Sequence, residues 1–489
     1  MKASLAKRRL IRLATDVINK NAFRLLIAWV IILSLLYATL SILRHDHFQS
    51  GGFDLGLYDQ AVWQYSRFLS PYNTIKERFI LGDHLTLTLP LLAPLFWLWD
   101  NVKALLIFQA FWLSFSSLAI YKLCRIRRFS PLTSLNLSFI YGFFFGIQFA
   151  VFFEFHPVTI GVGLIAWLVY FLESQKKRLF LPTLILLLLT QENMGIALAS
   201  LGLIYLFRKE YRQLALAFII GGLGWSLLAA KIISIFSDVG FQYWPEISLN
   251  PLKIIVCFFN APEKREIWLY SLSWFSFLPL LSPGAILAVL LDLSQYFVTG
   301  QEFTRMWTPF QHHRAILAPF LLLGALDALV FLKGKKVKPQ AASIILVIIA
   351  LGLQYLFHFP LNKLSKPIYW KSESWMNDNR ALFKTIPQDA SLATQQNLVP
   401  HLSHRQEIYL VWPRQHDFEP PPCGQKTCWW LDFSGQPEYL VVDLHPHQWV
   451  TQLLESNENF ESAVRNMEKA GKIVLEREIN SAKIYRINY

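Results

Sequence analysis

The sequence predicts a mainly α-helical, multi-pass membrane protein of about eleven transmembrane helices with a small α/β domain at its C-terminus. Hydrophobic residues make up 54% of the 489 positions and charged residues only 16%, which is too apolar for a soluble chain of this length. Apolar runs of membrane length recur up to residue 359. Basic residues collect in short clusters beside these runs, as in the cytoplasmic loops of membrane proteins.

The net charge of the chain is +13, and a basic chain of this kind could bind nucleic acid. The basic residues instead lie where a membrane protein needs them, and the 17 tryptophans fit aromatic belts at the headgroup level. The composition therefore indicates contact with the lipid bilayer and no nucleic-acid partner.

Residues 1–22 form a basic N-terminus, and the first apolar run follows at 23–43. This run is too long for a signal peptide, and no small-residue cleavage site follows it. We therefore predict an uncleaved first membrane helix. The positive-inside rule then places residues 1–22 in the cytoplasm.

Further runs of membrane length define a transmembrane domain over 23–359. The clear runs are 23–43, 103–123, 131–152, 213–236, 315–332 and 340–358, and the shorter ones are 158–173, 179–190, 193–207, 267–282 and 284–299.

The segment 85–99 is apolar but short, with two prolines, and could either cross the membrane or lie on it. If it crossed, the arginines after the helix 103–123 would lie outside. If it lies on the outer surface, they lie inside, as the positive-inside rule prefers. We therefore predict one outer loop over 44–102. The later basic clusters then also fall inside: 176–178, 208–212 and 333–338.

Residues 360–489 are polar and lack a membrane-length run. Strand-like pieces occur at 407–412, 438–443, 472–476 and 482–487, and helical patterns at 376–386 and 458–470. We predict a soluble α/β domain on the extracytoplasmic side.

Two cysteines of this domain, Cys423 and Cys428, form a C-x4-C spacing in a polar segment. The sequence offers no further soft ligands in a zinc-site spacing. A local disulfide is compatible with an extracytoplasmic location.

In the predicted topology, acids, imidazoles and guanidinium groups from four loops gather on the outer side of the membrane. Such a collection suits a charged, phosphorylated substrate. The candidate residues are Asp54, Asp59, Asp83, His84, Glu154, His156, Glu192, Arg305, His312, His313 and Arg314.

Several of these residues also have a purely structural explanation. Asp54 could cap a helix that begins after Gly51 and Gly52. His156 precedes a proline and could simply end a helix. Arg305 could be a charge at the rim of the site. A buried acid such as Glu192 is costly unless it is paired or faces water, which favours a role in the site.

The order of the motifs resembles a known family. The segments FDLGLYDQAVW, GDHLTLTLPLLAPLFWL, EFHP, TQENMG and QHHRAILAPFLLLGAL follow one another as in a bacterial family of polytopic membrane proteins of unknown function. The segment IPQDASLATQQNLVPHLSHRQEIYLV is similar as well, so the resemblance covers almost the whole chain. That family resembles a distant branch of the GT-C membrane glycosyltransferases. This implies a GT-C-like fold in the bacterial inner membrane.

GT-C enzymes take a sugar from a polyprenyl-phosphate carrier at the outer membrane face. In them, an aspartate of the first outer loop acts as general base or binds a divalent metal ion. The resemblance assigns this role to Asp54, with Asp59 as the second catalytic candidate. The chain departs from many GT-C loops, because their two acids are adjacent and these are not. Gln191 also stands where relatives often carry a lysine.

The leaving polyprenyl phosphate needs cationic partners, and Arg305, Arg314 and protonated His312 or His313 are the available ones. Two other functions remain open. A transporter or flippase would carry polar residues through the full membrane depth, often in broken helices. A non-catalytic scaffold would only present the C-terminal domain.

Overall fold

The computed structural model describes residues 2–243, 250–298, 301–424, 426–446 and 456–489. The chain is mainly helical and divides into two compact units that are each built from separate stretches of sequence. Unit 1 comprises residues 1–40, 84–88 and 107–365, and unit 2 comprises 41–83, 89–106 and 366–489. Except for residues 84–88, the first loop therefore belongs to the same unit as the C-terminal region.

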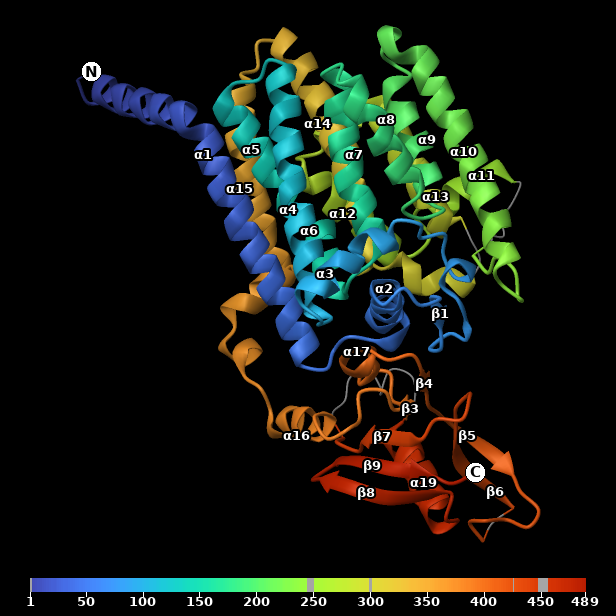
Figure 1. The fold of residues 1–489 in the computed structure, drawn as a ribbon. Helices are drawn as coiled ribbons and strands as arrows, with labels where there is room; N and C mark the ends of the chain where they lie inside the picture. Colours follow the sequence, from blue (N-terminus) through green and yellow to red (C-terminus); the bar gives the residue numbers. More distant parts are fainter. Residues whose placement is uncertain (1, 244–249, 299–300, 425, 447–455) are drawn as a thin grey trace. The chain divides into compact units, whose positions relative to one another are not determined.

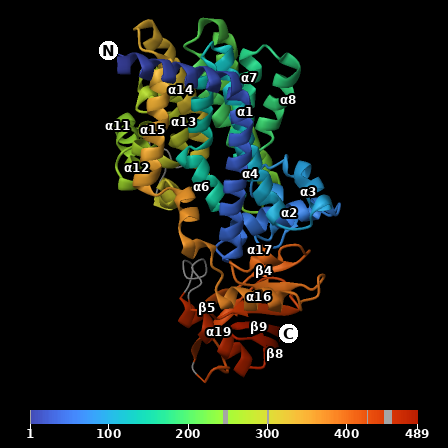
Figure 2. The same ribbon diagram turned by 90° about the vertical axis from the view of Figure 1, so that its left-hand side faces the viewer.

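Unit 1 is helical, and its long helices α1, α4, α7 and α15 run alongside one another in both views (Figures 1 and 2). Its elements are α1 (Lys2–Asp46) up to residue 40, α4 (Lys103–Ile126) from residue 107, α5 (Pro131–Gly142), α6 (Phe145–Phe153), α7 (Pro157–Glu173), α8 (Lys177–Leu188), α9 (Met194–Tyr205), η4 (Lys209–Tyr211), α10 (Arg212–Ile235), α11 (Pro251–Cys257), α12 (Pro262–Trp274), η5 (Leu278–Leu281), α13 (Pro283–Phe297), η6 (Gln301–Trp307), η7 (His312–Ile316), α14 (Leu317–Gly334), α15 (Pro339–Phe357) and η8 (Pro360–Ser365).

Most of the predicted membrane runs coincide with helix, although residue 299, the last of the run 284–299, lies outside the described residues. The run 267–282 was wrong as a single helix, because α12 ends at Trp274 and only the short turn η5 follows. Within the described part of the chain, five helices are long and apolar enough to cross a membrane, or six if the bent pair α5 and α6 is one span. The five are 17–46, 103–126, 209–235, 312–334 and 339–357. The other runs form helices below membrane length, so length and composition support several spans but not the eleven expected.

The predicted helix 131–152 is broken into α5 and α6, which meet at an angle of 40°. Two side chains donate hydrogen bonds to backbone carbonyls at the break. The hydroxyl of Tyr37 donates to the Gly142 carbonyl at 2.6 Å, and the Trp274 indole donates to the Ile140 carbonyl at 3.1 Å. A carbonyl that no longer has its helical partner is costly in an apolar interior, so these bonds stabilise the break.

Unit 2 joins the loop elements to a sheet domain. Its elements are η1 (Gly52–Gly56), α2 (Leu57–Ser66), β1 (Tyr72–Asn73), β2 (Arg78–Phe79), η2 (Ile80–Gly82), η3 (Leu89–Leu92), α3 (Ala93–Leu98), η9 (Pro367–Trp370), α16 (Ser374–Phe383), β3 (Leu392–Thr394), α17 (Val399–Leu402), β4 (Ile408–Leu410), β5 (Trp412–Asp417), β6 (Thr427–Asp432), β7 (Tyr439–Asp443), α19 (Asn457–Lys469), β8 (Ile473–Ile479) and β9 (Ala482–Ile487).

The main sheet of unit 2 has five strands in the order β4-β3-β7-β9-β8. Strands β4, β3 and β7 are parallel, and β9 and β8 continue the sheet as an antiparallel hairpin. Strands β5 and β6 form a separate antiparallel pair, and a disulfide between Cys423 and Cys428 lies at their connection.

Alternate residues of β7 point to opposite faces of this sheet, which gives it two cores. Leu440 and Val442 pack with α19 in one core. Val441 faces the other core, which also contains Phe48 and Ile75 from the first loop. The shared core explains why the loop and the C-terminal region form one unit.

Candidate functional site

The link between α6 and α7 is held by one glutamine side chain. Pro157 begins α7, and the preceding His156 is extended, as a residue before proline should be. Gln109 of α4 donates to the Glu154 carbonyl at 2.8 Å and accepts from the His156 amide at 3.0 Å. It also accepts from the Thr159 hydroxyl at 3.0 Å. These contacts fix the EFHP turn and therefore the position of the His156 ring.

Three imidazoles and a phenol lie in contact around this turn, as two stacked pairs of rings that are tilted by 56° between His312 and His313. The rings of His156 and His312 are stacked with centroids 3.5 Å apart, and His312 and His313 are 3.9 Å apart. His313 stacks in turn on Tyr296 of α13 at 4.8 Å. The turn before α7, the turn η7 and helix α13 therefore meet at one place.

Arg314 lies beside this stack and is fully buried. Its guanidinium donates to the carbonyls of Met306 and Thr308 and lies 5.2 Å from the centre of the Tyr296 ring and 5.6 Å from that of Phe297. Asp292 is close enough to interact with it electrostatically.

Polar atoms of this region remain without a hydrogen-bond partner among the described residues. They are Nη1 of Arg314, both ring nitrogens of His313, Nδ1 of His312 and Oδ2 of Asp292. A buried polar atom of this kind costs free energy, so native proteins rarely leave several together without a purpose. The arrangement can donate hydrogen bonds to a bound group that carries acceptor oxygens.

His84 and Glu192 form a buried pair within unit 1. Nδ1 of His84 lies 2.7 Å from the Glu192 carboxylate, which also accepts from the Leu85 amide at 3.2 Å. The amide of Gln191 approaches the same nitrogen at 3.4 Å, and the His84 ring stacks on Tyr243 at 4.7 Å. Glu192 is thus a paired buried acid.

The pair is close to the ring stack. His84 interacts electrostatically with His312 and His313, and Tyr296 is hydrogen-bonded to Asn193. The structure therefore brings together residues from five regions of the sequence, which we call the imidazole cluster: His84, His156, Glu192, Tyr296, His312, His313 and Arg314.

Two predicted site residues lie at the margin of the cluster. Glu154 is buried, and its carbonyl is bound by Gln109. Arg305 is exposed in η6, and its carbonyl accepts from Gln311 at 3.2 Å. The structure thus places Arg305 where a rim charge would be.

Asp54 belongs to unit 2 and lies inside the five-residue π-helix η1. Gly51 occupies the N-cap position, so Asp54 is not the cap of this helix, and its side chain is half-buried. The glycines beside it allow close packing on α17. A Cβ on Gly56 would lie 2.7 Å from Cγ1 of Val399.

Asp59, also in unit 2, is fully buried in α2 and tied to the C-terminal region. It accepts from the Ser403 hydroxyl at 2.5 Å and contacts Nε2 of His404 at 3.1 Å. Nδ1 of His404 lies 2.8 Å from Asp100. Burial alone would lower the pKa of His404, but the two carboxylates outweigh it and raise the pKa to about 9. His404 is therefore a cation between two carboxylates at neutral pH.

Asp83, in unit 2, pairs with Lys76, whose ammonium lies 2.8 Å from one carboxylate oxygen and 2.9 Å from the other. It follows the short helix η2 as its C-terminal neighbour.

The candidate aspartates do not come with a ready metal site. In the described part of the chain, no group of three or more His, Cys, Asp or Glu side chains could hold a metal ion. Among these residues, Asp54 is therefore not part of a set of three such side chains that would fit the divalent metal ion implied by the resemblance.

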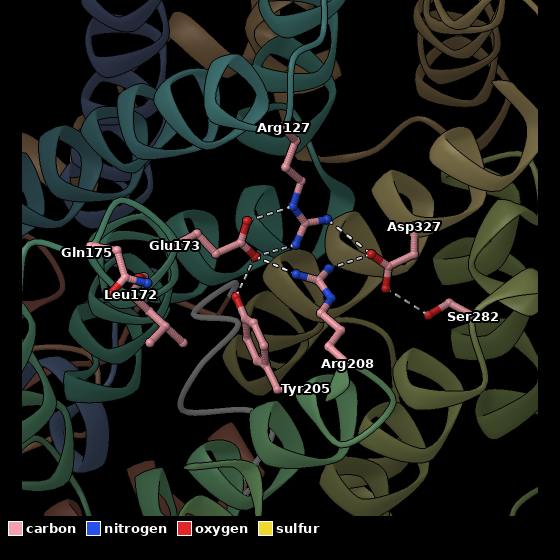
Figure 3. Close-up of polar contacts among 8 residues, drawn as sticks. All are labelled: Arg127, Leu172, Glu173, Gln175, Tyr205, Arg208, Ser282 and Asp327. Carbon is pink, nitrogen blue, oxygen red and sulfur yellow. Dashed lines mark hydrogen bonds and ion pairs between the residues drawn. The ribbon is translucent and has the colours of Figure 1, made fainter. Parts of the chain in front are cut away.

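A second polar cluster lies at the other end of α7, and sequence reasoning did not find it (Figure 3). Arg127 makes two hydrogen bonds to Glu173, at 2.6 and 2.9 Å, and a third to Asp327 at 3.1 Å. Arg208 contacts Glu173 at 2.7 Å and Asp327 at 2.5 Å. Tyr205 also donates to Glu173 at 2.7 Å. We call these five residues the ion-pair cluster.

One signal could have revealed this cluster. Asp327 lies inside the apolar run 315–332, where an acid is costly unless it has a partner. The arginines Arg127 and Arg208 had been interpreted only as cytoplasmic loop charges. Asp292 in α13 carries the same signal and is almost fully buried.

The model of a family described as "Predicted membrane protein (DUF2079)" matches residues 44–466. No curated protein matches the chain.

Proposed function

We propose that this chain, which belongs to the family of predicted membrane proteins (DUF2079), is a glycosyltransferase. It moves a sugar from a polyprenyl-phosphate donor to an acceptor hydroxyl at the outer face of the bacterial inner membrane. The motif order that resembles the GT-C enzymes supports this reaction. It implies a GT-C-like membrane domain with about eleven crossings, a cytoplasmic N-terminus and an extracytoplasmic C-terminal domain.

One observation carries the proposal. Arg314 and His313 are buried, and their side chains keep nitrogen atoms without partners among the described residues. A guanidinium with a vacant nitrogen is well suited to a phosphate oxygen. Neutral imidazoles can donate one hydrogen bond each. We therefore assign the phosphate of the donor to the imidazole cluster.

In the transfer step, an acceptor oxygen attacks the anomeric carbon of the sugar. The bond between this carbon and the phosphate oxygen breaks, and its electron pair leaves with the polyprenyl phosphate. Arg314 stabilises the negative charge that develops on that phosphate. The acceptor proton passes to a carboxylate, which the resemblance identifies as Asp54.

The two aspartates of the first loop receive different roles. Asp59 has its carboxylate engaged by Ser403 and His404. We therefore propose that Asp59 holds the loop in place and that Asp54 alone is the base. This assignment of Asp54 rests on the sequence resemblance and is tested separately from the phosphate site.

The test uses the purified full-length chain with a panel of polyprenyl-phosphate sugars and follows release of polyprenyl phosphate. We expect Arg314→Lys to lower kcat/KM by about tenfold to a hundredfold, since a charged hydrogen bond contributes roughly 1.5–3 kcal/mol. The exposed Arg305→Gln is the matched control and should keep most activity. Asp54→Asn should abolish turnover without changing donor binding. A wild-type chain that turns over no donor would refute the proposed reaction.

The topology has its own test. A single cysteine introduced at Trp430 should be labelled from the outer side and should resist labelling from the cytoplasmic side. Labelling from the cytoplasm would place the C-terminal domain inside and overturn the proposed orientation.

A lipid or solute transporter is the second candidate, because two observations favour it. Transporters often contain broken helices such as the pair α5 and α6. The ion-pair cluster at Glu173 and the imidazole cluster at His156 together put polar groups at both ends of α7. Movement of a labelled polyprenyl lipid across vesicle membranes by the purified protein, with no sugar transfer, would favour this function. A chain that neither transfers nor transports would leave the scaffold function.

A further inference from the structure

Unit 2 carries a group of strongly exposed apolar side chains outside any helix of membrane length. Phe68 is 85% exposed, Trp97 56% and Leu98 87%. Leu91 and Trp99 are also exposed. We call these five residues the loop patch. Phe68 follows the end of α2, and the other four lie in or directly after the segment η3–α3. Both segments belong to unit 2.

The aromatic side chains of the patch are held in place by defined contacts. Phe68 has a φ of +58°, in the left-handed region that a bulky residue rarely adopts. Its ring lies 6.1 Å from that of Trp97, and the Trp97 indole donates to the Ser66 carbonyl at 2.8 Å. The backbone at Phe68 is therefore bent in a way that presents the ring beside Trp97.

The same unit contains the ends of two helices of membrane length. Residues 41–46 are the last turn of α1, and residues 103–106 are the first turn of α4. An ion pair of 2.7 Å between Lys103 and Asp46 ties these two ends together. Trp99 precedes Lys103 by four residues, so the chain can separate them by roughly 14 Å at most. The patch is therefore close to the level at which two spans leave the bilayer.

Other exposed apolar side chains of unit 2 follow the same distribution. Ile368 and Trp370 lie in η9, shortly after the span α15 ends. Among the other described residues of unit 2, the exposed large apolar residues are Tyr72 in the first loop and Val474, Leu475 and Tyr489 in the sheet domain. Apolar exposure is thus concentrated in the segments next to the spans.

We propose that the loop patch inserts into the headgroup region of the bilayer and anchors unit 2 to the membrane surface. Its occupant is lipid. Tryptophan and phenylalanine beside leucine are the side chains that favour this region, and the patch lies within a few residues of the Lys103 end of α4. Arg67, next to Phe68, is paired with Asp100 at 2.6 Å, so charged groups border the patch on its polar side. The inference does not depend on the glycosyltransferase function.

The experiment places a spin label on the full-length protein in lipid nanodiscs, at Phe68→Cys and at Leu98→Cys in separate samples. Val474→Cys on β8 is the matched control, because Val474 is also half exposed but lies on the sheet. The half-buried free cysteine Cys257 is changed to serine in all samples. Accessibility to oxygen, which concentrates in lipid, and to a water-soluble nickel complex is measured at each position.

We expect the ratio of oxygen to nickel accessibility at positions 68 and 98 to exceed that at 474 by at least threefold. A ratio equal to that of the control would overturn the proposal, because it would mean exposure to water. A label shielded from both reagents would also overturn it, because it would mean that protein covers the patch. Hydroxyl-radical labelling of the unaltered protein in nanodiscs provides a second measurement. Trp97 and Trp99 should be modified at least threefold more slowly than in the detergent-stripped, unfolded chain and more slowly than exposed Tyr489.

Discussion

The two polar clusters of unit 1 lie at opposite ends of the same helix and differ in how their charges are satisfied. Helix α7 is 17 residues long, so the clusters are separated by roughly 25 Å along its axis. In the ion-pair cluster at Glu173, two guanidinium groups face two carboxylates, and each is paired. In the imidazole cluster at His156, Arg314 and His313 retain nitrogen atoms without partners in the described part of the chain.

The difference separates two uses of buried polar groups. A balanced set of charges fastens helices together and has little left to offer a ligand. A set in which several buried donor nitrogens lack acceptors gains little stability from them and is explained better by a bound group. Charge alone would not distinguish these clusters, because both contain arginine. They also differ in burial, since Arg314 is fully buried whereas the charged side chains of the ion-pair cluster are 7–29% exposed.

The largest expected effect is the loss of one acid from the ion-pair cluster. Glu173→Ala leaves Arg127 and Arg208 with Asp327 as the one carboxylate that pairs with both. The uncompensated buried charge should destabilise the protein by about 3–5 kcal/mol. The free energy of unfolding in detergent is the measurement. A change below about 1 kcal/mol would mean that the pairing contributes little and would break the comparison.

A pH series in unit 2 tests whether a balanced charge cluster stabilises the other unit as well. The pKa of His404 is raised to about 9. Its contribution is therefore complete below about pH 6.5, the ordinary pKa of histidine, and is lost as the pH rises through about 9. We expect roughly 2–3 kcal/mol of stability to disappear over this interval.

The matched variant for this series is His404→Gln, which cannot carry a proton. This variant should have a lower free energy of unfolding than the unaltered protein at neutral pH. Its free energy of unfolding should be nearly constant between pH 6 and 9.5. If the free energy of unfolding of the unaltered protein is equally constant over that range, His404 does not stabilise the unit as a cation.

A smaller effect is expected when the ion-pair cluster loses only a neutral contact. Tyr205→Phe removes the hydroxyl that donates to Glu173 but leaves both arginines in place. The expected loss is about 1 kcal/mol in the unfolding free energy. A loss as large as that of Glu173→Ala would show that the hydroxyl, and not the ion pairs, maintains the cluster.

The smallest expected effect on stability is in the imidazole cluster. His313→Phe keeps a ring to stack on Tyr296 and removes two nitrogens that lack partners among the described residues. Replacing such a group by an apolar one of similar shape is nearly neutral or slightly stabilising. Turnover of the lipid donor should nevertheless fall at least tenfold. Lower stability together with unchanged turnover would assign His313 to packing.

The helices of unit 1 could be predicted well from sequence, because each needs only a local apolar run. The run 315–332 corresponds to α14 (Leu317–Gly334) in this way. The break between α5 and α6 could not be predicted, because it depends on Tyr37 and Trp274 from distant parts of the chain.

The candidate site was predicted in part. The rule that polar groups at membrane depth mark a function pointed to His84, His156, Glu192, His312 and Arg314, and the structure gathers them. It did not reveal that Asp54 and Asp59 lie in the other unit, because the packing of the first loop with the sheet depends on contacts such as Ser403 with Asp59.

In unit 2, the predicted strands 438–443 and 482–487 correspond to β7 and β9. The strand β3 (Leu392–Thr394) was missed, because three residues carry too little of an alternating pattern. The β5–β6 pair was missed in part for the same reason, since the sequence around its disulfide is polar.

The bond between Tyr37 and Gly142 has a consequence for biosynthesis. The two residues are 105 positions apart, so α1 emerges from the ribosome long before the broken pair that it serves. Until then, the Tyr37 hydroxyl must form its hydrogen bonds with water, lipid or the backbone of α1. Only the arrival of α5 and α6 completes the contact. The first helix thus already carries a hydrogen-bond donor that the break between α5 and α6 needs later.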